Sequence, residues 1–201
     1  MKRIIPYDSQ KYFHILYGKE LAFVHINRTA GTSILYSLGI KTKNHFSVKD
    51  VINASSKEKW ENVFTFTFVR NPWSKVVSQY NHRVKTNQTK LKENNIPFSE
   101  WVKKTYGDEK DLTYYDKPLM FMPQYDCLVD NTGIININFI GKFEDLKEDF
   151  LNLSSHLEVK KKLKKTNASK LVNYKDYYNS GTAKIIEKHF EKDIEYFKYQ
   201  F

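Results

Sequence analysis

Two short apolar runs stand out in the first third of the chain, and each is followed by a polar break and a helical pattern. Residues 21–26 (LAFVHI) and 64–69 (FTFTFV) have the length and composition of buried β-strands. The first run is followed by the polar stretch 27–32 and then by helical spacing over 33–38. The second is followed by a helix predicted over 73–84, with a proline at its first turn. Each run therefore predicts a strand, a tight loop and a helix in that order.

The rest of the chain continues the alternation of strand and helix patterns. We expect a helix, then two strands around a turn, then two helices, at residues 99–106, 126–129, 134–139, 143–153 and 182–197. This alternation is typical of a three-layer α/β fold, with a central, mainly parallel sheet and helices on both faces. No repeat or low-complexity linker divides the chain, so residues 1–201 are expected to form a single domain. Ligands of such sheets bind beyond the carboxyl ends of the strands, where both tight loops are expected.

Composition narrows the class of protein without selecting a function. The 201 residues are 40% hydrophobic and 15% aromatic, which is enough for a folded core. A net charge of +10 favours anionic partners, yet frequent solvated lysines explain it equally well. Cys127 is the only cysteine, so neither an intrachain disulfide nor a thiolate zinc cluster is expected. Residues 1–10 hold no signal-peptide-like apolar run and no stretch approaches a membrane span, so we expect a cytoplasmic chain without an integral membrane segment.

The loop after the first predicted strand has the composition of an anion-binding site. Its candidate ligands are Arg28, Thr29, Ala30, Gly31, Thr32 and Ser33. A strand, a small-residue turn and a helix start together direct backbone N–H groups at an anion, and Arg28 adds a fixed positive charge. The loop lacks the first Gly and the Lys of the common nucleotide phosphate loop, which argues against an ordinary ATPase or kinase. A plain strand-to-helix connection with a hydroxyl cap is the alternative.

The loop after the second predicted strand adds a candidate pair of phosphate ligands. Arg70 stands at the end of the strand, and Ser78 lies about two helical turns later. An arginine and a hydroxyl can share one phosphate, with the arginine bidentate. Taken alone, a surface ion-pair residue and a helix-face serine would explain both positions.

Together the two loops resemble those of sulfotransferases that use 3′-phosphoadenosine 5′-phosphosulfate (PAPS), especially the carbohydrate type that includes heparan sulfate 2-O-sulfotransferases. The family's first loop commonly reads His-Ile-Pro-Lys-Thr-Ala-Gly-Thr-Ser, and residues 25–33 read HINRTAGTS. The family's second motif has an Arg and, eight residues later, a Ser, as at Arg70 and Ser78. Further similarity follows in order at residues 122–124, 139–146, 177–179 and 193–197.

The resemblance implies a P-loop NTPase-like fold and transfer of a sulfuryl group from PAPS to a hydroxyl, with carbohydrate the favoured acceptor. It places residues 28–33 on the 5′-phosphosulfate and Arg70 with Ser78 on the 3′-phosphate, and adenosine 3′,5′-bisphosphate is the expected product. No metal is expected, because the reaction in this family needs none. No nucleic-acid partner is expected either, since the aromatic residues are not interleaved with arginines. The acceptor's identity and the oligomeric state stay open.

Two residues depart from the family's first loop, because Asn27 replaces Pro and Arg28 replaces the Lys that neutralises the leaving oxygen. Arginine keeps the charge but changes shape and reach, so either Arg28 takes this catalytic role or the chain is a weak or inactive relative that binds the nucleotide or an anionic glycan. His45 resembles the catalytic base of the 2-O-sulfotransferases, with Glu144 as a rival and a loop histidine without a role as the alternative. The basic residues 163–170 resemble a loop that covers the nucleotide in heparan enzymes, although a solvated charge run explains them equally well.

Overall fold

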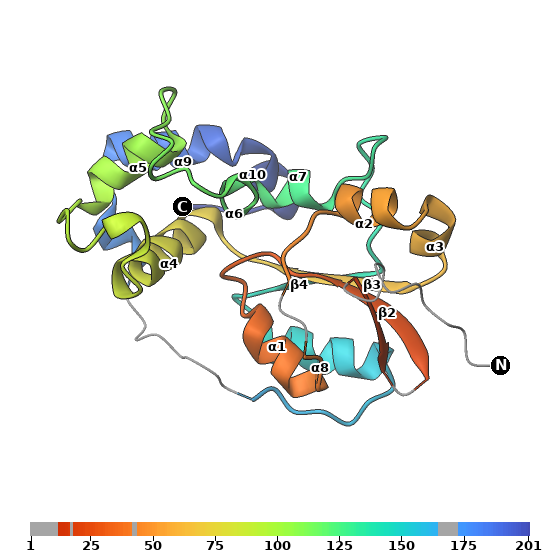
Figure 1. Ribbon diagram of the computed structural model, residues 1–201. Helices are drawn as coiled ribbons and strands as arrows, with labels where there is room; N and C mark the ends of the chain where they lie inside the picture. The colour runs from red at the N-terminus through yellow and green to blue at the C-terminus, as the bar shows by residue number, and fades with distance from the viewer. Residues whose placement is uncertain (1–11, 17, 42–43, 165–172) are drawn as a thin grey trace. The chain divides into compact units, whose positions relative to one another are not determined.

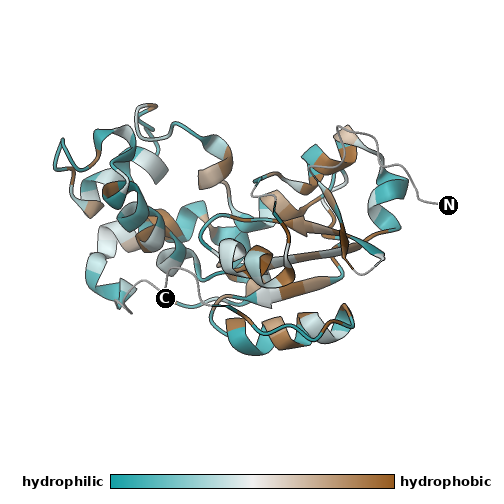
Figure 2. Cartoon of the chain, turned by 60° about the horizontal axis from the view of Figure 1, so that its bottom comes forward, coloured by the Kyte–Doolittle hydropathy of each residue, from teal (hydrophilic) through white to brown (hydrophobic). Residues whose placement is uncertain are grey.

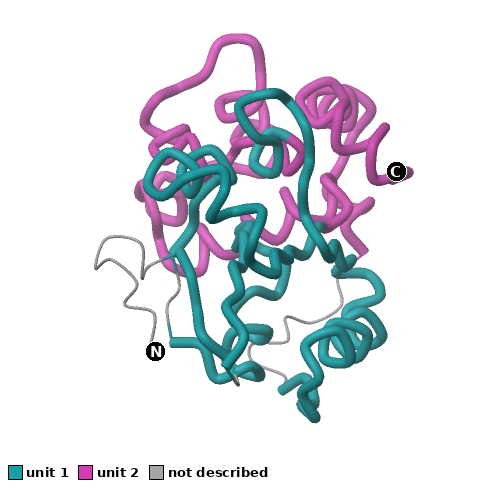
Figure 3. Tube along the Cα trace, turned by 90° about the vertical axis from the view of Figure 1, so that its right-hand side faces the viewer, with its two compact units in different colours: residues 1–69, 126–168 teal, residues 70–125, 169–201 magenta. Residues whose placement is uncertain are grey.

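The backbone of the protein groups into two compact units. The computed structural model describes residues 12–16, 18–41, 44–164 and 173–201. One unit comprises Met1–Val69 with Asp126–Ala168, and the other comprises Arg70–Tyr125 with Ser169–Phe201; Figure 3 colours them separately. Each unit is therefore assembled from two separate stretches of chain, and the single domain expected for residues 1–201 stays a prediction.

The first unit contains a four-stranded sheet in the order β1-β2-β3-β4. The short edge strand β1 (Phe13–Leu16) runs antiparallel to β2 (Lys19–Val24). β2, β3 (Phe64–Val69) and β4 (Phe139–Lys142) are parallel to one another. The sheet is thus mainly parallel, as the alternation of strand and helix patterns predicted.

Helices cover both faces of this sheet, which confirms the predicted three-layer α/β fold (Figure 1). α1 (Gly31–Leu38) and α8 (Leu146–His156) lie on one face, and α2 (Val48–Ala54) and α3 (Lys57–Glu61) lie on the other. Strands buried on both faces read as continuous apolar runs, and Figure 2 shows the central strands as largely hydrophobic. The core between the sheet and α1 and α8 consists of Leu21, Phe23, Ile34, Leu35, Leu38, Phe66, Phe68, Phe150, Leu153, Leu157 and Val159.

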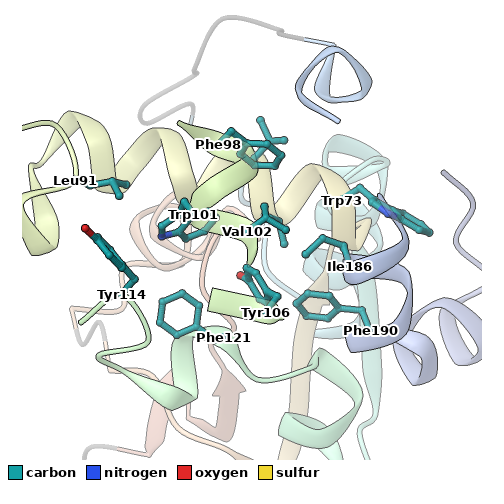
Figure 4. Close-up of a cluster of buried hydrophobic side chains, with 12 residues drawn as sticks. Trp73, Leu91, Phe98, Trp101, Val102, Tyr106, Tyr114, Phe121, Ile186 and Phe190 are labelled. Carbon is teal, nitrogen blue, oxygen red and sulfur yellow. The ribbon is translucent and has the colours of Figure 1, made fainter. Parts of the chain in front are cut away.

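The second unit is helical among its described residues. Its elements are α4 (Pro72–Lys85), η2 (Gln88–Lys90), α5 (Phe98–Tyr106), α6 (Pro118–Phe121), η3 (Tyr174–Tyr177), α9 (Ser180–His189) and α10 (Glu191–Phe197). Aromatic rings dominate its core, as Figure 4 shows for Trp73, Phe98, Trp101, Tyr106, Phe121 and Phe190. The helices predicted at 73–84 and 99–106 are confirmed within one or two residues at each end.

The prediction of two strands at residues 126–129 and 134–139 is wrong. The first segment belongs to α7 (Gln124–Leu128), and only Val129 and Ile135 pair, through an isolated antiparallel bridge. The buried residues Gln124, Cys127 and Leu128 have helical spacing, but so short an apolar run does not distinguish a strand from a helix. The predicted turn between these segments does form.

Two other helices have different boundaries from those predicted. The helix predicted from residue 143 begins at Leu146, because the residues before it form β4 and its turn. The helix predicted over 182–197 is two helices, which meet at Phe190, whose φ of −110° and ψ of 25° interrupt the helical backbone. The Phe190 ring at the break is fully buried.

Candidate functional site

The loop after β2 turns through two residues in the left-handed backbone region. β2 ends one residue before His25, so His25 opens the loop rather than lying inside the strand as the apolar pattern predicted. Arg28 has a φ of 67° and Ala30 a φ of 66°, values that residues other than glycine rarely adopt. The buried Thr29 hydroxyl donates to the Ile26 carbonyl over 2.9 Å and closes the turn. Left-handed residues inside a tight turn direct successive N–H groups into one concavity that suits an anion.

The helix that follows adds donors to the same loop. Ala30 is the N-cap of α1 and makes no side-chain cap hydrogen bond, and its carbonyl accepts from the N–H groups of Ser33 (2.9 Å) and Ile34 (3.2 Å). The first N–H groups of an α-helix have no acceptor within the helix, so those of Gly31 and Thr32 belong to its positive end. Thr32 is exposed and Ser33 is buried, so the two hydroxyls of this turn have different access to solvent.

Gly31 is required by the close approach of the His25 ring. A Cβ at this position would lie 2.0 Å from both Cδ2 and Nε2 of His25. The ring itself stacks on Phe23, with ring centroids 5.3 Å apart and planes within 16°. The glycine at this position therefore has a steric reason.

His45 reaches this loop from the segment ahead of α2. Its Nδ1 lies 2.7 Å from the carbonyl oxygen of His25, and the two imidazole rings have centroids 4.2 Å apart. Because a carbonyl only accepts, this contact assigns the hydrogen to Nδ1, and a neutral ring then carries its lone pair on Nε2. A capping box between Ser47 and Asp50 fixes the backbone just after His45. The structure thus brings His45 to the first residue of the loop; its role as the base stays a prediction.

Arg28 is the half-buried cation of the loop. Burial lowers the pKa of its guanidinium, but an arginine starts from so high a value that it stays charged at neutral pH. A partly desolvated charge acts on nearby anions more strongly than a solvated one. The rival base, Glu144, is exposed at the turn before α8.

Arg70 and Ser78 lie in the second unit, Arg70 two residues ahead of α4 and Ser78 in its second turn. The guanidinium of Arg70 donates to Ser74 Oγ from Nε (3.0 Å) and from Nη2 (2.8 Å). Ser78 follows Ser74 by four residues, so both side chains lie on one face of the helix. The sequence did not single out Ser74, because Arg70 precedes the helix and the four-residue spacing rule applies only within one.

The basic residues 163–170 are described only at their beginning. The Lys164 N–H donates to Ser37 Oγ of α1 over 2.7 Å, and the Lys164 ammonium lies 5.1 Å from the Tyr36 ring centroid. Residues 165–170 of this predicted nucleotide-covering loop lie outside the described residues. The described part therefore fixes one end of the segment on α1.

Comparison with known protein families matches residues 10–200 to the family described as the sulfotransferase family. The chain belongs to the sulfotransferase family. The match to the sulfotransferases takes in both loops and all the described helices and strands. A protein of Archaeoglobus fulgidus described as uncharacterized is 31% identical to this chain over 111 residues, which are 55% of this chain and 81% of that protein. No solved structure matches this chain. None of the helices in the described ranges is long and apolar enough to cross a membrane.

Proposed function

We propose that this sulfotransferase moves the sulfuryl group of PAPS onto a hydroxyl group of a carbohydrate. The loop of residues 25–33 is the main support for this proposal. It contains a cation, Arg28, two residues in the left-handed backbone region, Arg28 and Ala30, and the N-terminus of α1. Membership of the sulfotransferase family supports sulfuryl transfer as the chemistry. The choice of PAPS and of a sugar rests on the resemblance of the motifs to carbohydrate sulfotransferases.

The donor's two anionic ends are assigned to two sets of residues. The 5′-phosphosulfate is proposed to bind Arg28, Thr29, Ala30, Gly31, Thr32 and Ser33. Because the Thr29 hydroxyl already donates to Ile26, Thr29 would serve through its backbone. The 3′-phosphate is proposed to bind Arg70 and Ser78, and Ser74 joins this set because its hydroxyl already holds the guanidinium. Adenosine 3′,5′-bisphosphate is then the product.

The two proposed catalytic residues have separate tasks. In the reaction, the acceptor oxygen bonds to sulfur while the bond from sulfur to the phosphate oxygen breaks, and the acceptor proton passes to Nε2 of His45. Arg28 would stabilise the negative charge that grows on the departing oxygen, an interaction that lowers the barrier more than it tightens binding. The Nδ1 contact to the His25 carbonyl suits this use, since it leaves Nε2 as the proton acceptor.

A relative that binds without turnover is the second candidate function. It is favoured by Arg28, which stands where the family has Lys and which differs from Lys in shape and reach. Such a protein would bind the nucleotide or an anionic glycan through the same loops.

Titration with a pair of nucleotides tests the proposed donor site. We expect adenosine 3′,5′-bisphosphate to bind about ten- to hundredfold more tightly than AMP, because a charged hydrogen-bond partner contributes about 1.5–3 kcal/mol. Arg70→Ala should erase most of this preference. Lys85→Ala is the matched control, since it removes one exposed positive charge from α4, the helix that follows Arg70. Equal binding of the two nucleotides by the unmutated protein would refute the assignment.

A further inference from the structure

A buried polar network in the second unit holds Arg70 and has no role in the proposed chemistry. Gln124, Asp193 and Lys75 are each 0% exposed. Gln124 and Asp193 lie in two of the segments that resemble the family, residues 122–124 and 193–197. The proposed sulfuryl transfer assigns no role to either segment. Burying a carboxylate and an amide costs free energy unless both groups are hydrogen-bonded. The partners of these two side chains therefore indicate what the buried groups hold in place.

The side-chain amide of Gln124 pairs with the backbone of Arg70 at both polar atoms. The Arg70 N–H donates to Oε1 of Gln124 over 2.9 Å, and Nε2 of Gln124 donates to the Arg70 carbonyl over 2.8 Å. One primary amide thereby satisfies the donor and the acceptor of one residue, as a neighbouring strand would. Because β3 ends at Val69, these two bonds hold the backbone at the position where the ladder of the sheet stops.

Asp193 in turn fixes the orientation of Gln124. Its Oδ2 accepts from the backbone N–H of Gln124 (2.9 Å) and from Nε2 of the same residue (2.9 Å), and its Oδ1 accepts from the Tyr125 N–H (2.7 Å). Both hydrogens of the Gln124 amide are therefore used, one on Asp193 and one on Arg70. The carboxylate prevents the amide from flipping, since a flip would place the Gln124 oxygen against Asp193.

The charge of Asp193 is partly offset within the same unit. Burial raises the pKa of its carboxyl, while the hydrogen bonds from Tyr125 and Gln124 and the positive charge of Lys75 act in the opposite direction. The Lys75 ammonium also lies 5.2 Å from the centroid of the buried Phe190 ring. Apolar residues would serve a core that needed only packing. The hydrogen bonds of Gln124 and Asp193 instead specify one geometry.

Arg70 is thus held at both ends, by Gln124 at its backbone and by Ser74 at its guanidinium. We propose that Gln124 and Asp193 are positioning residues that set Arg70 for the 3′-phosphate of the nucleotide, so that they determine selectivity for a 3′-phosphorylated donor. The inference rests on the proposed function, which assigns Arg70 to that phosphate. A binding group ordered before the ligand arrives loses less conformational freedom on binding.

Gln124→Met tests this role, because methionine has a similar size but cannot hydrogen-bond the Arg70 backbone. We expect the preference for adenosine 3′,5′-bisphosphate over AMP to fall about tenfold, with AMP affinity unchanged, as expected for a misplaced binding group. Asp193→Asn, which keeps one acceptor oxygen, should lower the preference less. In an Arg70→Ala background Gln124→Met should have no further effect, since the glutamine acts through Arg70.

Tyr80→Phe is the matched control, because it removes a hydrogen bond to the Ile96 carbonyl (2.9 Å) within the same unit. It should leave the nucleotide preference unchanged, and thermal unfolding of each variant reports its stability. A folded Gln124→Met protein with the full preference would overturn the positioning role. Failure of both Gln124→Met and Asp193→Asn to fold would also overturn it, in favour of a structural role. If the unmutated protein shows no preference, the proposed function fails and the positioning role fails with it.

Discussion

Replacing Gly31 by alanine tests the geometry of the loop after β2. The added Cβ would lie 2.0 Å from two atoms of the His25 ring, whereas carbon atoms in contact are about 3.5–4.0 Å apart. The ring or the loop must therefore shift by about 1.5–2 Å to restore ordinary contact. The ring has little room, since it stacks on Phe23 and lies beside His45. Gly31 is not among the described glycines with positive φ, so the penalty is steric and not a matter of backbone conformation.

Overpacking of this kind costs about 1–3 kcal/mol. In a chain of this length, each kcal/mol lowers the thermal midpoint by about 2–4 °C, so Gly31→Ala should lower it by about 2–12 °C. Nucleotide affinity should fall as well, because the same backbone is assigned to the phosphosulfate. Thermal unfolding followed by circular dichroism measures the first effect, and nucleotide titration measures the second.

Gly181→Ala is the matched control for this substitution. Gly181 also lies in the first turn of a helix, but the nearest atom to an added Cβ is Asn179 Oδ1 at 3.4 Å. Alanine favours the helix by up to about 1 kcal/mol over glycine, so this variant should be neutral or stabilised. In a His25→Ala background the cost of Gly31→Ala should largely disappear, since the clashing ring is gone. An unchanged midpoint for Gly31→Ala, or an equal cost without the His25 ring, would refute the reasoning.

Three further predictions concern the two proposed catalytic residues and are measured as rates of sulfuryl transfer. His45→Ala should lower turnover by about 10²–10⁴-fold while nucleotide affinity barely moves; near-normal turnover would transfer the role of base to another group, with His25 or Glu144 tested next. Arg28→Ala should lower turnover more than it lowers affinity, and unchanged transfer at saturating PAPS would exclude Arg28 from catalysis. Arg28→Lys should retain or raise activity if the loop keeps the family's geometry, and lower it if Asn27 has reshaped the loop around a guanidinium.

The sequence predicts the two strand-loop-helix segments well, because their signals are local. β3 coincides with the predicted residues 64–69, and α1 begins within two residues of its predicted start. A change from a continuous apolar run to helical spacing marks such a loop without knowledge of the tertiary fold. The local pattern at residues 126–129 does not identify α7, since a run of four residues is consistent with a strand or a helix.

Contacts between distant residues could not be predicted in this way. The hydrogen bond from His45 to the His25 carbonyl joins residues 20 apart, and that between Gln124 and Asp193 joins residues 69 apart. No hydrophobic period along one segment encodes the partner of a polar side chain in another. The contact between Arg70 and Ser74 is more local, since four residues separate them, but Arg70 precedes α4 and the helical spacing rule does not apply to it.

The most direct test of the central claim is incubation of the protein with PAPS and a panel of carbohydrate acceptors, followed by mass spectrometry. We predict that at least one acceptor gains a single sulfuryl group and that adenosine 3′,5′-bisphosphate forms in equal amount. The Arg28→Ala and His45→Ala proteins, tested beside it, should form much less of both products. Tight binding of PAPS with no modified acceptor and no released bisphosphate would contradict sulfuryl transfer and favour a relative that only binds.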